Sequence, residues 1–166
     1  MPRSALTPGH TTVSGAHTTP TDVDLRDTGG RRPATPFDRA PSGLILLSLN
    51  GLDTVRRFYG ATTYRAAKTL VAGRIRSRVR AGDGVSWTRN GTFRITLGTA
   101  TSRTDAAALA ADLCAQIMLP LTANGHEINL QVSSGVAGAE PGATAAGLLG
   151  TARCALRDAE TAYAVR

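Results

Sequence analysis

Aromatic side chains, lysines and long apolar runs are all scarce in this sequence. Aromatic residues make up 4% of the 166 positions, and Lys68 is the single lysine. No apolar run is long enough to span a bilayer, and the first residues lack the apolar core of a secretory signal. We therefore expect a cytoplasmic protein with no membrane partner. The scarcity of aromatic side chains also argues against a surface that stacks the bases of nucleic acids.

Cysteines are few as well. Cys114 and Cys154 lie in apolar helical patterns, with no Cys or His at metal-ligand spacing. This pattern indicates two core thiols in a reducing compartment, with neither a disulfide nor a metal site. His10 and His17 have no supporting ligands nearby, so no metal site is predicted there either.

Positive charge is in excess and unevenly placed, with a formal net charge of +7. Residues 1–42 carry five Arg and four Asp, which gives +1, whereas residues 43–166 carry fourteen basic and eight acidic side chains, which gives +6. Such an excess favours anionic partners such as nucleotides, nucleic acids or acidic proteins. A solvated arginine-rich face is the alternative interpretation.

Composition divides the chain into two parts. Residues 1–42 are rich in Thr, Pro, Gly and Ser and have almost no large apolar side chains. Such a segment cannot bury enough surface to offset the entropy lost on ordering, so a disordered tail is predicted. Residues 43–166 are predicted to form one domain.

Within this domain, the apolar run from Leu44 to Leu49 predicts a strand buried on both faces. Asn90-Gly91 and Asn124-Gly125 predict two type I′ hairpin turns. The remaining periodicity predicts helices over residues 53–59, 63–79, 102–118 and 144–162, and strands in residues 80–97, 119–122 and 127–136. This order predicts an α/β sandwich with a central mixed sheet flanked by helices.

The hairpin is also where the chain resembles a known family. Arg89-Asn90-Gly91-Thr92-Phe93 is similar to the signature hairpin of the bacterial GGDEF domains, the diguanylate cyclases, with the last Phe retained. Tyr59-Gly60, Arg80-Ala-Gly-Asp83 and Ser133-Ser-Gly-Val-Ala137 match the family in the same order and at the same separations. The resemblance covers about residues 43–160 and implies a nucleotidyl cyclase-like fold.

The resemblance also implies a degenerate site. Family members join two GTP molecules and hold Mg²⁺ with carboxylates at the end of the first strand and in the hairpin, because Mg²⁺ prefers anionic oxygens. The corresponding positions here carry no carboxylate: Ser48, Asn50, Gly91 and Thr92. From this loss we predict that the chain is not an enzyme and binds no metal or other cofactor.

Other family positions are changed too. The paired glycines of the hairpin correspond to Arg89 and Asn90, and an arginine side chain would occupy the space of the nucleotide. The guanine-binding positions correspond to Arg56 and Arg65, and the phosphate-binding lysine to Glu160.

Arg80-x-x-Asp83 matches the inhibitory site of the family, which binds the product cyclic di-GMP, and it keeps the spacing of five residues before the signature. An arginine can donate to guanine O6 and N7, while a carboxylate accepts from guanine N1 and N2. We therefore predict a receptor for cyclic di-GMP that uses Arg80 and Asp83. A helix end followed by a polar turn is the alternative explanation of this motif.

Two other functions remain open. The first is a protein-interaction module that binds no nucleotide and acts through a protein partner or as a homodimer. The second is nucleic-acid binding through a basic helical stripe, which we expect less because aromatic residues are scarce and residues 1–42 are nearly neutral. The stripe consists of Arg74, Arg76, Arg78 and Arg80.

Overall fold

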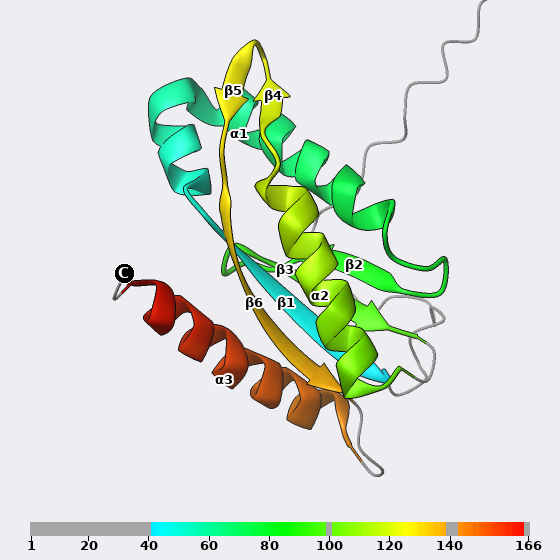
Figure 1. The fold of residues 1–166 in the computed structure, drawn as a ribbon. Coiled ribbons are helices and arrows are strands. Elements are labelled where there is room, and N and C mark those ends of the chain that lie inside the picture. Colours follow the sequence, from blue (N-terminus) through cyan, green and yellow to red (C-terminus); the bar gives the residue numbers. More distant parts are fainter. Residues whose placement is uncertain (1–40, 99–100, 139–142, 165–166) are drawn as a thin grey trace, which may run out of the picture.

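The computed structural model describes residues 41–98, 101–138 and 143–164. A four-stranded sheet in the order β2-β3-β1-β6 lies between helices on its two faces, and a separate two-stranded hairpin stands at one end (Figure 1). The predicted α/β sandwich is thus confirmed, and all three strand pairings of the described four-stranded sheet are antiparallel. The elements are β1 (Gly43–Asn50), α1 (Leu52–Arg76), β2 (Gly84–Trp87), β3 (Thr92–Leu97), α2 (Arg103–Met118), β4 (Leu121–Ala123), β5 (His126–Ile128), β6 (Gln131–Gly138) and α3 (Ala145–Ala164).

β1 is a central strand and pairs antiparallel with both β3 and β6. Successive side chains of a strand point to opposite faces, so a strand covered on both sides must be apolar throughout. Ile45 and Leu47 pack on one face and Leu44 and Leu46 on the other, and all four are buried. This explains why the strand has a continuous apolar run and no polar alternation.

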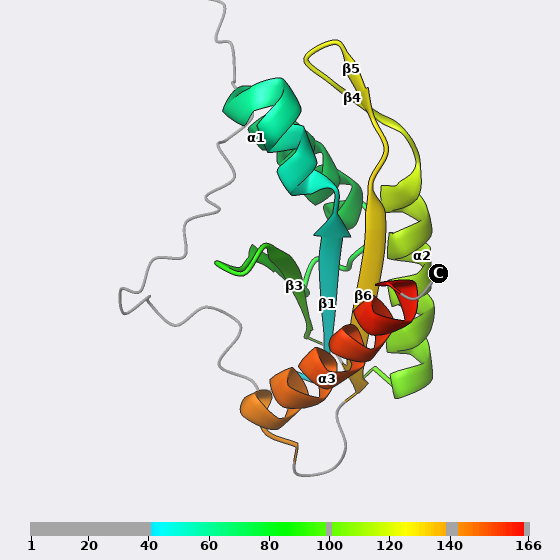
Figure 2. The same ribbon diagram turned by 90° about the vertical axis from the view of Figure 1, so that its left-hand side faces the viewer.

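The helices are divided between the faces of the sheet. α1 and α2 cover one face of the sheet. Their apolar side chains pack there against Phe93, Ile95 and Leu97 of β3 and form the larger core. α3 packs on the other face against β6 and β1 and forms a smaller core around Leu148 and Ala152. Figure 2 shows α3 lying across β1 and β6 near one end of the sheet. The second face is therefore covered by α3 alone among the described helices.

α3 lies very close to the sheet at Gly135 of β6. A Cβ atom at this position would lie 2.1 Å from the carbonyl oxygen of Ala152 and 2.5 Å from the backbone nitrogen of Leu156. Both contacts are with backbone atoms of the helix, which cannot rotate away. Only glycine allows this separation between β6 and α3.

α1 contains the predicted break at Gly60, whose φ of 81° and ψ of 173° are not helical. The helix ends at Arg76, so the prediction that it extends to residue 79 is wrong. The Ser77 hydroxyl donates to the carbonyl of Arg74 at 2.8 Å. Serine competes in this way for backbone groups near helix ends, and the chain turns from here toward β2.

α1 and α2 are joined by Arg74. Its guanidinium donates to the backbone carbonyl oxygens of Gln116 at 3.1 Å, Leu119 at 2.5 Å and Pro120 at 2.7 Å. The last carbonyls of a helix have no partner within the helix and carry its negative dipole end. Arg74 therefore caps the C-terminus of α2, a role that its sequence position in α1 does not reveal.

The two hairpin turns differ. Asn124 and Gly125 both have positive φ, 50° and 79°, which confirms the predicted type I′ turn. At the other hairpin only Gly91 has positive φ, and its N–H donates to the carbonyl of Thr88 at 3.2 Å. The tip is thus a turn centred on residues 89–90 and followed by a left-handed glycine, so the type I′ prediction is wrong there.

The β4–β5 hairpin packs beside the first segment of α1 (Figure 1). Tyr59 stacks on His126 with ring centroids 4.5 Å apart, and Asn124 lies within 3.4 Å of the Thr63 hydroxyl. The predicted strand over residues 127–136 is interrupted after Ile128 and resumes as β6 at Gln131.

None of the described helices combines the length and the apolar character needed to cross a membrane. The predicted tail, residues 1–42, lies outside the described residues except for its last two. Of these, Ser42 donates to the carbonyl of Leu97 from its backbone N–H at 2.9 Å and from its hydroxyl at 3.0 Å.

Candidate functional site

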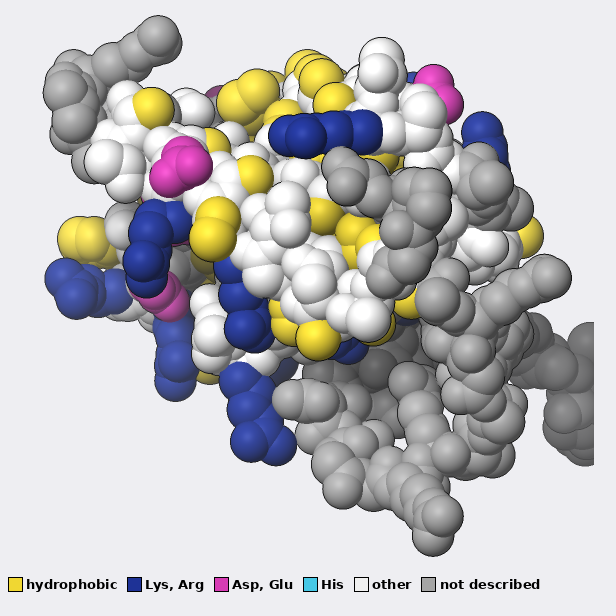
Figure 3. Space-filling model, turned by 90° about the horizontal axis from the view of Figure 1, so that it is seen from below, with side chains coloured by type: hydrophobic (Ala, Val, Ile, Leu, Met, Phe, Trp, Pro, Cys, Tyr) yellow, Lys and Arg dark blue, Asp and Glu magenta, His cyan; other side chains and the backbone are white. Residues whose placement is uncertain are grey.

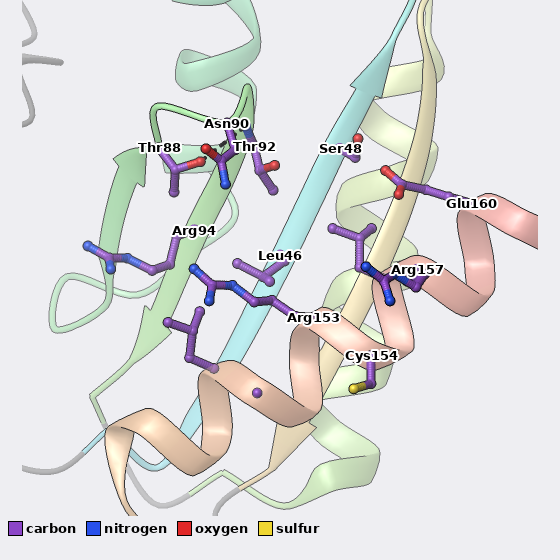
Figure 4. A pocket seen from close by; sticks show the side chains of 13 residues that line it. Leu46, Ser48, Thr88, Asn90, Thr92, Arg94, Arg153, Cys154, Arg157 and Glu160 are labelled. Atoms are coloured by element: carbon purple, nitrogen blue, oxygen red, sulfur yellow. Dashed lines mark hydrogen bonds between the residues drawn. The ribbon is translucent and has the colours of Figure 1, made fainter.

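A cleft opens between α3 and the β2–β3 hairpin, on the face of the sheet that α3 covers (Figure 4). Its volume is about 600 Å³, which is within the range of small-molecule sites. Leu46 of β1 lies at its floor, the hairpin forms one wall and α3 the other. The polar and charged lining residues are Ser48, Thr88, Asn90, Thr92, Arg94, Arg153, Arg157 and Glu160.

The strand register explains which side chains reach the cleft. Leu46 pairs with Arg94, and Ser48 pairs with Thr92. Directly paired residues point to the same face of a sheet, so Leu46 and Ser48 of β1 share this face with the polar side chains Arg94 and Thr92 of β3. α3 packs on β1 and β6, and the cleft lies over the polar side chains of β3 beside it.

The cleft is positively charged, since three arginines and one glutamate line it. Arg94 is oriented by its Nε, which donates to the Ser86 hydroxyl at 3.2 Å. Arg153 and Arg157 are one turn apart on α3, and their side chains extend from the helix toward the cleft (Figure 4). Viewed from below, Lys and Arg side chains gather along one side of the molecule, with few acidic side chains among them (Figure 3).

The residues at the family's magnesium positions do not fit a magnesium site. Ser48 and Thr92 offer hydroxyls at one end of the cleft, and Asn50 lies within 3.4 Å of the hydroxyl of Ser133 on β6. Among the described residues that line the cleft, Glu160 has the only carboxylate, and it lies on the opposite wall. Among the described residues, no three His, Cys, Asp or Glu side chains gather closely enough to hold a metal ion. Mg²⁺ prefers one or two carboxylates together with phosphate oxygens.

A cation–aromatic cluster occupies the region of the family's guanine positions. The Arg56 guanidinium lies over the ring of Tyr64 at 5.9 Å, and the Lys68 ammonium lies over the rings of Tyr64 and Trp87 at 5.7 and 5.2 Å. Partial burial, together with the nearby charge of Arg65, lowers the pKa of Lys68. This cluster packs α1 against the hairpin through Trp87, which meets Phe93 edge-on at 4.7 Å.

Arg80 and Asp83 lie together in the turn between α1 and β2. The Arg80 N–H donates to Asp83 Oδ2 at 2.9 Å, and the Asp83 N–H donates back to the Arg80 carbonyl at 2.9 Å. Asp83 Oδ1 accepts from the N–H of Gly98 at 3.0 Å. The turn is at the opposite end of β2 from the hairpin tip, so it is separate from the cleft.

Two arginines of the basic stripe predicted as a possible nucleic-acid surface, Arg74 and Arg78, bind other parts of the domain. Arg74 caps α2, and Arg78 forms an ion pair with Asp112 of α2 at 3.6 Å. The four arginines therefore do not form one continuous set of available cations, which weakens the case for a nucleic-acid interface.

The cysteines occupy different environments. Cys114 packs against the larger core, and burial raises the pKa of its thiol, although a hydrogen bond with Ser134 partly offsets this. Cys154 is exposed and lines the cleft, so the prediction that both are core thiols is wrong for Cys154. Ala152 and Leu156, each two residues away from Cys154 on α3, face the sheet and belong to the smaller core.

The arginines of α3 are the site residues that sequence analysis missed. Arg153 and Arg157 are four residues apart, which places them on one helix face. That spacing is visible in the sequence, but the cleft that they face depends on where α3 packs.

Comparison with solved structures shows the same fold. The GGDEF domain of PA1120 (TpbB or YfiN) from Pseudomonas aeruginosa matches with a TM-score of 0.67 and 22% identity, over 75% of this chain and 73% of that chain. An EAL/GGDEF domain protein from M. capsulatus matches with a TM-score of 0.66 and 26% identity, over 77% of this chain and 83% of that one.

The diguanylate cyclase SiaD from Pseudomonas aeruginosa, solved in complex with its activator SiaC, matches with a TM-score of 0.65 and 19% identity. This match covers 72% of this chain and 46% of SiaD. No curated protein sequence matches the chain.

Residues 34–164 match the family model described as diguanylate cyclase, GGDEF domain. This match contradicts the prediction that the chain is not an enzyme, because the matched family is one of cyclases. The prediction relied on a few side-chain positions, whereas the match extends over the whole fold and includes the cleft and the hairpin. With more than half of its length matched, the chain belongs to the GGDEF domain family, the family of the diguanylate cyclases.

Proposed function

We propose that this GGDEF domain acts in the cytoplasm as a receptor for cyclic di-GMP, and that Arg80 and Asp83 form the binding site. The supporting observation is the turn that holds them. Both oxygens of the Asp83 carboxylate accept backbone N–H groups, at 2.9 and 3.0 Å, so the carboxylate has a fixed position. A site that is ordered before binding loses less conformational entropy when the ligand arrives.

The chemistry of the turn suits a guanine base. Each Asp83 oxygen accepts one backbone hydrogen bond and keeps a second lone pair, which can accept from guanine N1–H or N2–H. The exposed Arg80 side chain can donate to guanine O6 and N7. Arg76 is exposed four residues earlier, and we assign its charge to a phosphate of the ligand.

Titration calorimetry of the full chain with cyclic di-GMP tests this role. Arg80→Ala should weaken binding by about ten-fold or more, because a charged hydrogen bond contributes about 1.5–3 kcal/mol. Asp83→Asn should also weaken binding, since it replaces an accepting oxygen with a donor. Arg89→Ala, at the hairpin tip, is the matched control and should bind like the unchanged chain. Absence of heat with the unchanged chain at high micromolar cyclic di-GMP would refute the receptor role.

A second candidate is interaction with a protein partner or a second copy of the chain. It is supported by exposed apolar side chains: Phe58 on α1 is 74% exposed and Leu119, after α2, is 51% exposed. The related SiaD has been solved with a protein activator, SiaC. Sedimentation of the unchanged chain and of Phe58→Ser would test self-association. A monomer at all concentrations in both would exclude the homodimer.

A further inference from the structure

Lys68, the single lysine of the chain, lies in an unusual environment on α1. Its Nζ is 5.7 Å from the centre of the Tyr64 ring and 5.2 Å from the centre of the Trp87 ring. It makes no hydrogen bond or ion pair with any residue that the structure describes. A lysine ammonium is normally a strongly hydrated point charge at the surface. The amine of Lys68 is held instead by two ring faces and by no carboxylate of the described residues.

This environment favours the neutral amine. Partial burial removes water from the ammonium, the adjacent Arg65 adds a like charge, and together they lower the pKa of Lys68. The ring faces attract the ammonium, but a neutral amine keeps the contact because its N–H groups also donate to aromatic rings. A lysine that is partly desolvated beside another cation is an activated nucleophile. The rings therefore position Lys68 Nζ while its lone pair becomes available.

The charges around Lys68 indicate which electrophile can approach it. Arg56 lies over the same Tyr64 ring at 5.9 Å, and both Arg56 and Arg65 are exposed. Positive charges gathered on one surface raise the local concentration of anions. Lys68 is only partly buried, so a small molecule can reach its amine. An acyl phosphate combines the required negative charge with an electrophilic carbonyl carbon.

We propose that Lys68 is a site of covalent acylation by an anionic acyl donor of the acyl phosphate class. The neutral Nζ attacks the carbonyl carbon, and a C–N bond forms as the C–O bond to phosphate breaks. Phosphate leaves with the electron pair of that bond, and the amine proton passes to water. The product is an uncharged amide, so acylation removes the cationic contact of Lys68 with Tyr64 and Trp87. This modification is separate from cyclic di-GMP binding at the turn.

Acetyl phosphate added to the full chain at neutral pH tests the site, with peptide mass spectrometry to follow each amine. Lys68 should be acetylated several-fold faster in the folded chain than in the same chain unfolded in urea. The α-amine of the chain, followed in the same samples, corrects for any effect of urea on the reagent. Burial alone would make the folded rate slower. An equal or slower rate in the folded chain would therefore overturn the proposal.

Variants separate the causes of the reactivity. Arg65→Gln should slow acetylation of Lys68, because it removes the like charge beside the amine. Arg57→Gln, at an exposed position on the same helix, is the matched control and should leave the rate unchanged. Arg80→Ala should also leave it unchanged, which separates this site from the receptor site. An equal rate in Arg65→Gln and the unchanged chain would contradict the activation by charge.

Trp87 provides a second measurement, because it is the single tryptophan and lies over Lys68. Acetylation should shift its fluorescence emission, since the positive charge over the ring is lost. Lys68→Gln, which is uncharged without any reagent, should give a shift in the same direction. Thermal melting verifies that each variant is folded. Unchanged emission after complete acetylation would overturn the loss of the ring contact.

Discussion

The carboxylate of Asp83 accepts a hydrogen bond from the backbone N–H of Gly98 at 3.0 Å, which ties the turn before β2 to the residue after β3. The same turn approaches Gly98 so closely that a Cβ atom there would lie 2.4 Å from the carbonyl oxygen of Gly82. The position of the Asp83 carboxylate thus depends on a glycine fifteen residues away.

We expect Gly98→Ala to displace this turn and weaken cyclic di-GMP binding several-fold, although residue 98 does not contact the ligand. Gly82→Ala is the matched control, because no atom lies within 4 Å of the added Cβ. Calorimetry with both variants, well below their melting temperatures, gives the comparison. Equal affinities would show that the turn does not define the site.

Arg74→Ala should lower the free energy of unfolding by about 1–3 kcal/mol, since several carbonyl oxygens at the end of α2 lose a charged donor. Arg76→Ala, in the same last turn of α1, should change it by no more than about 0.5 kcal/mol. Urea denaturation measures both. Similar losses for the two variants would mean that the cap of α2 contributes little.

Gly60→Ala should destabilise the domain by about 1–3 kcal/mol, because a φ of 81° with a ψ of 173° is available almost only to glycine. Gly73→Ala should instead stabilise it by about 0.4–1 kcal/mol, since Gly73 is inside α1 with open space around its Cβ position. Thermal melts of the pair show the opposite signs. Stabilisation by Gly60→Ala would mean that the break in α1 is not required.

Cys154 should react with iodoacetamide at neutral pH much faster than Cys114. Cys154 is exposed, whereas burial raises the pKa of Cys114 and so lowers its thiolate fraction at neutral pH. Raising the pH should therefore increase the Cys114 rate over a higher pH range than for an unperturbed thiol. Mass spectrometry of the labelled peptides gives both rates.

Removal of residues 1–40 should shift the melting temperature by no more than about a degree or two, because this segment offers no apolar stripe to the core. Ser42 is kept in the shortened chain because it bonds to Leu97. A much larger shift would contradict the prediction of a disordered tail.

The fold could be predicted from sequence where a local signal sufficed. The apolar run of β1, the alternation of Phe93, Ile95 and Leu97, and Gly60 each express a backbone requirement within a few residues. Asn124-Gly125 forms the predicted type I′ turn. Asn90-Gly91 does not, because the turn between β2 and β3 is centred on residues 89–90, one residue before the dipeptide. Dipeptide composition does not determine that shift.

The site was harder to predict, since it depends on packing between distant segments. Arg80 and Asp83 are close in sequence, and their resemblance to the family's inhibitory motif was enough to predict a site there. Arg153 and Arg157 line the cleft only because α3 packs on β1 and β6, across the cleft from β3. Arg74 is engaged only because α2 ends beside it. Loss of acidic residues at the family's magnesium positions was visible, but the arginines across the cleft were not.

The close contact between Gly135 of β6 and the backbone of α3 sets the distance of this helix from the sheet. Because the backbone of α3 rests directly on this residue, even a methyl group there must push the helix outward. Arg153 and Arg157 would move with the helix, while Arg94 would stay with the sheet. A substitution at this buried residue would therefore change the width of the cleft without changing any residue that lines it.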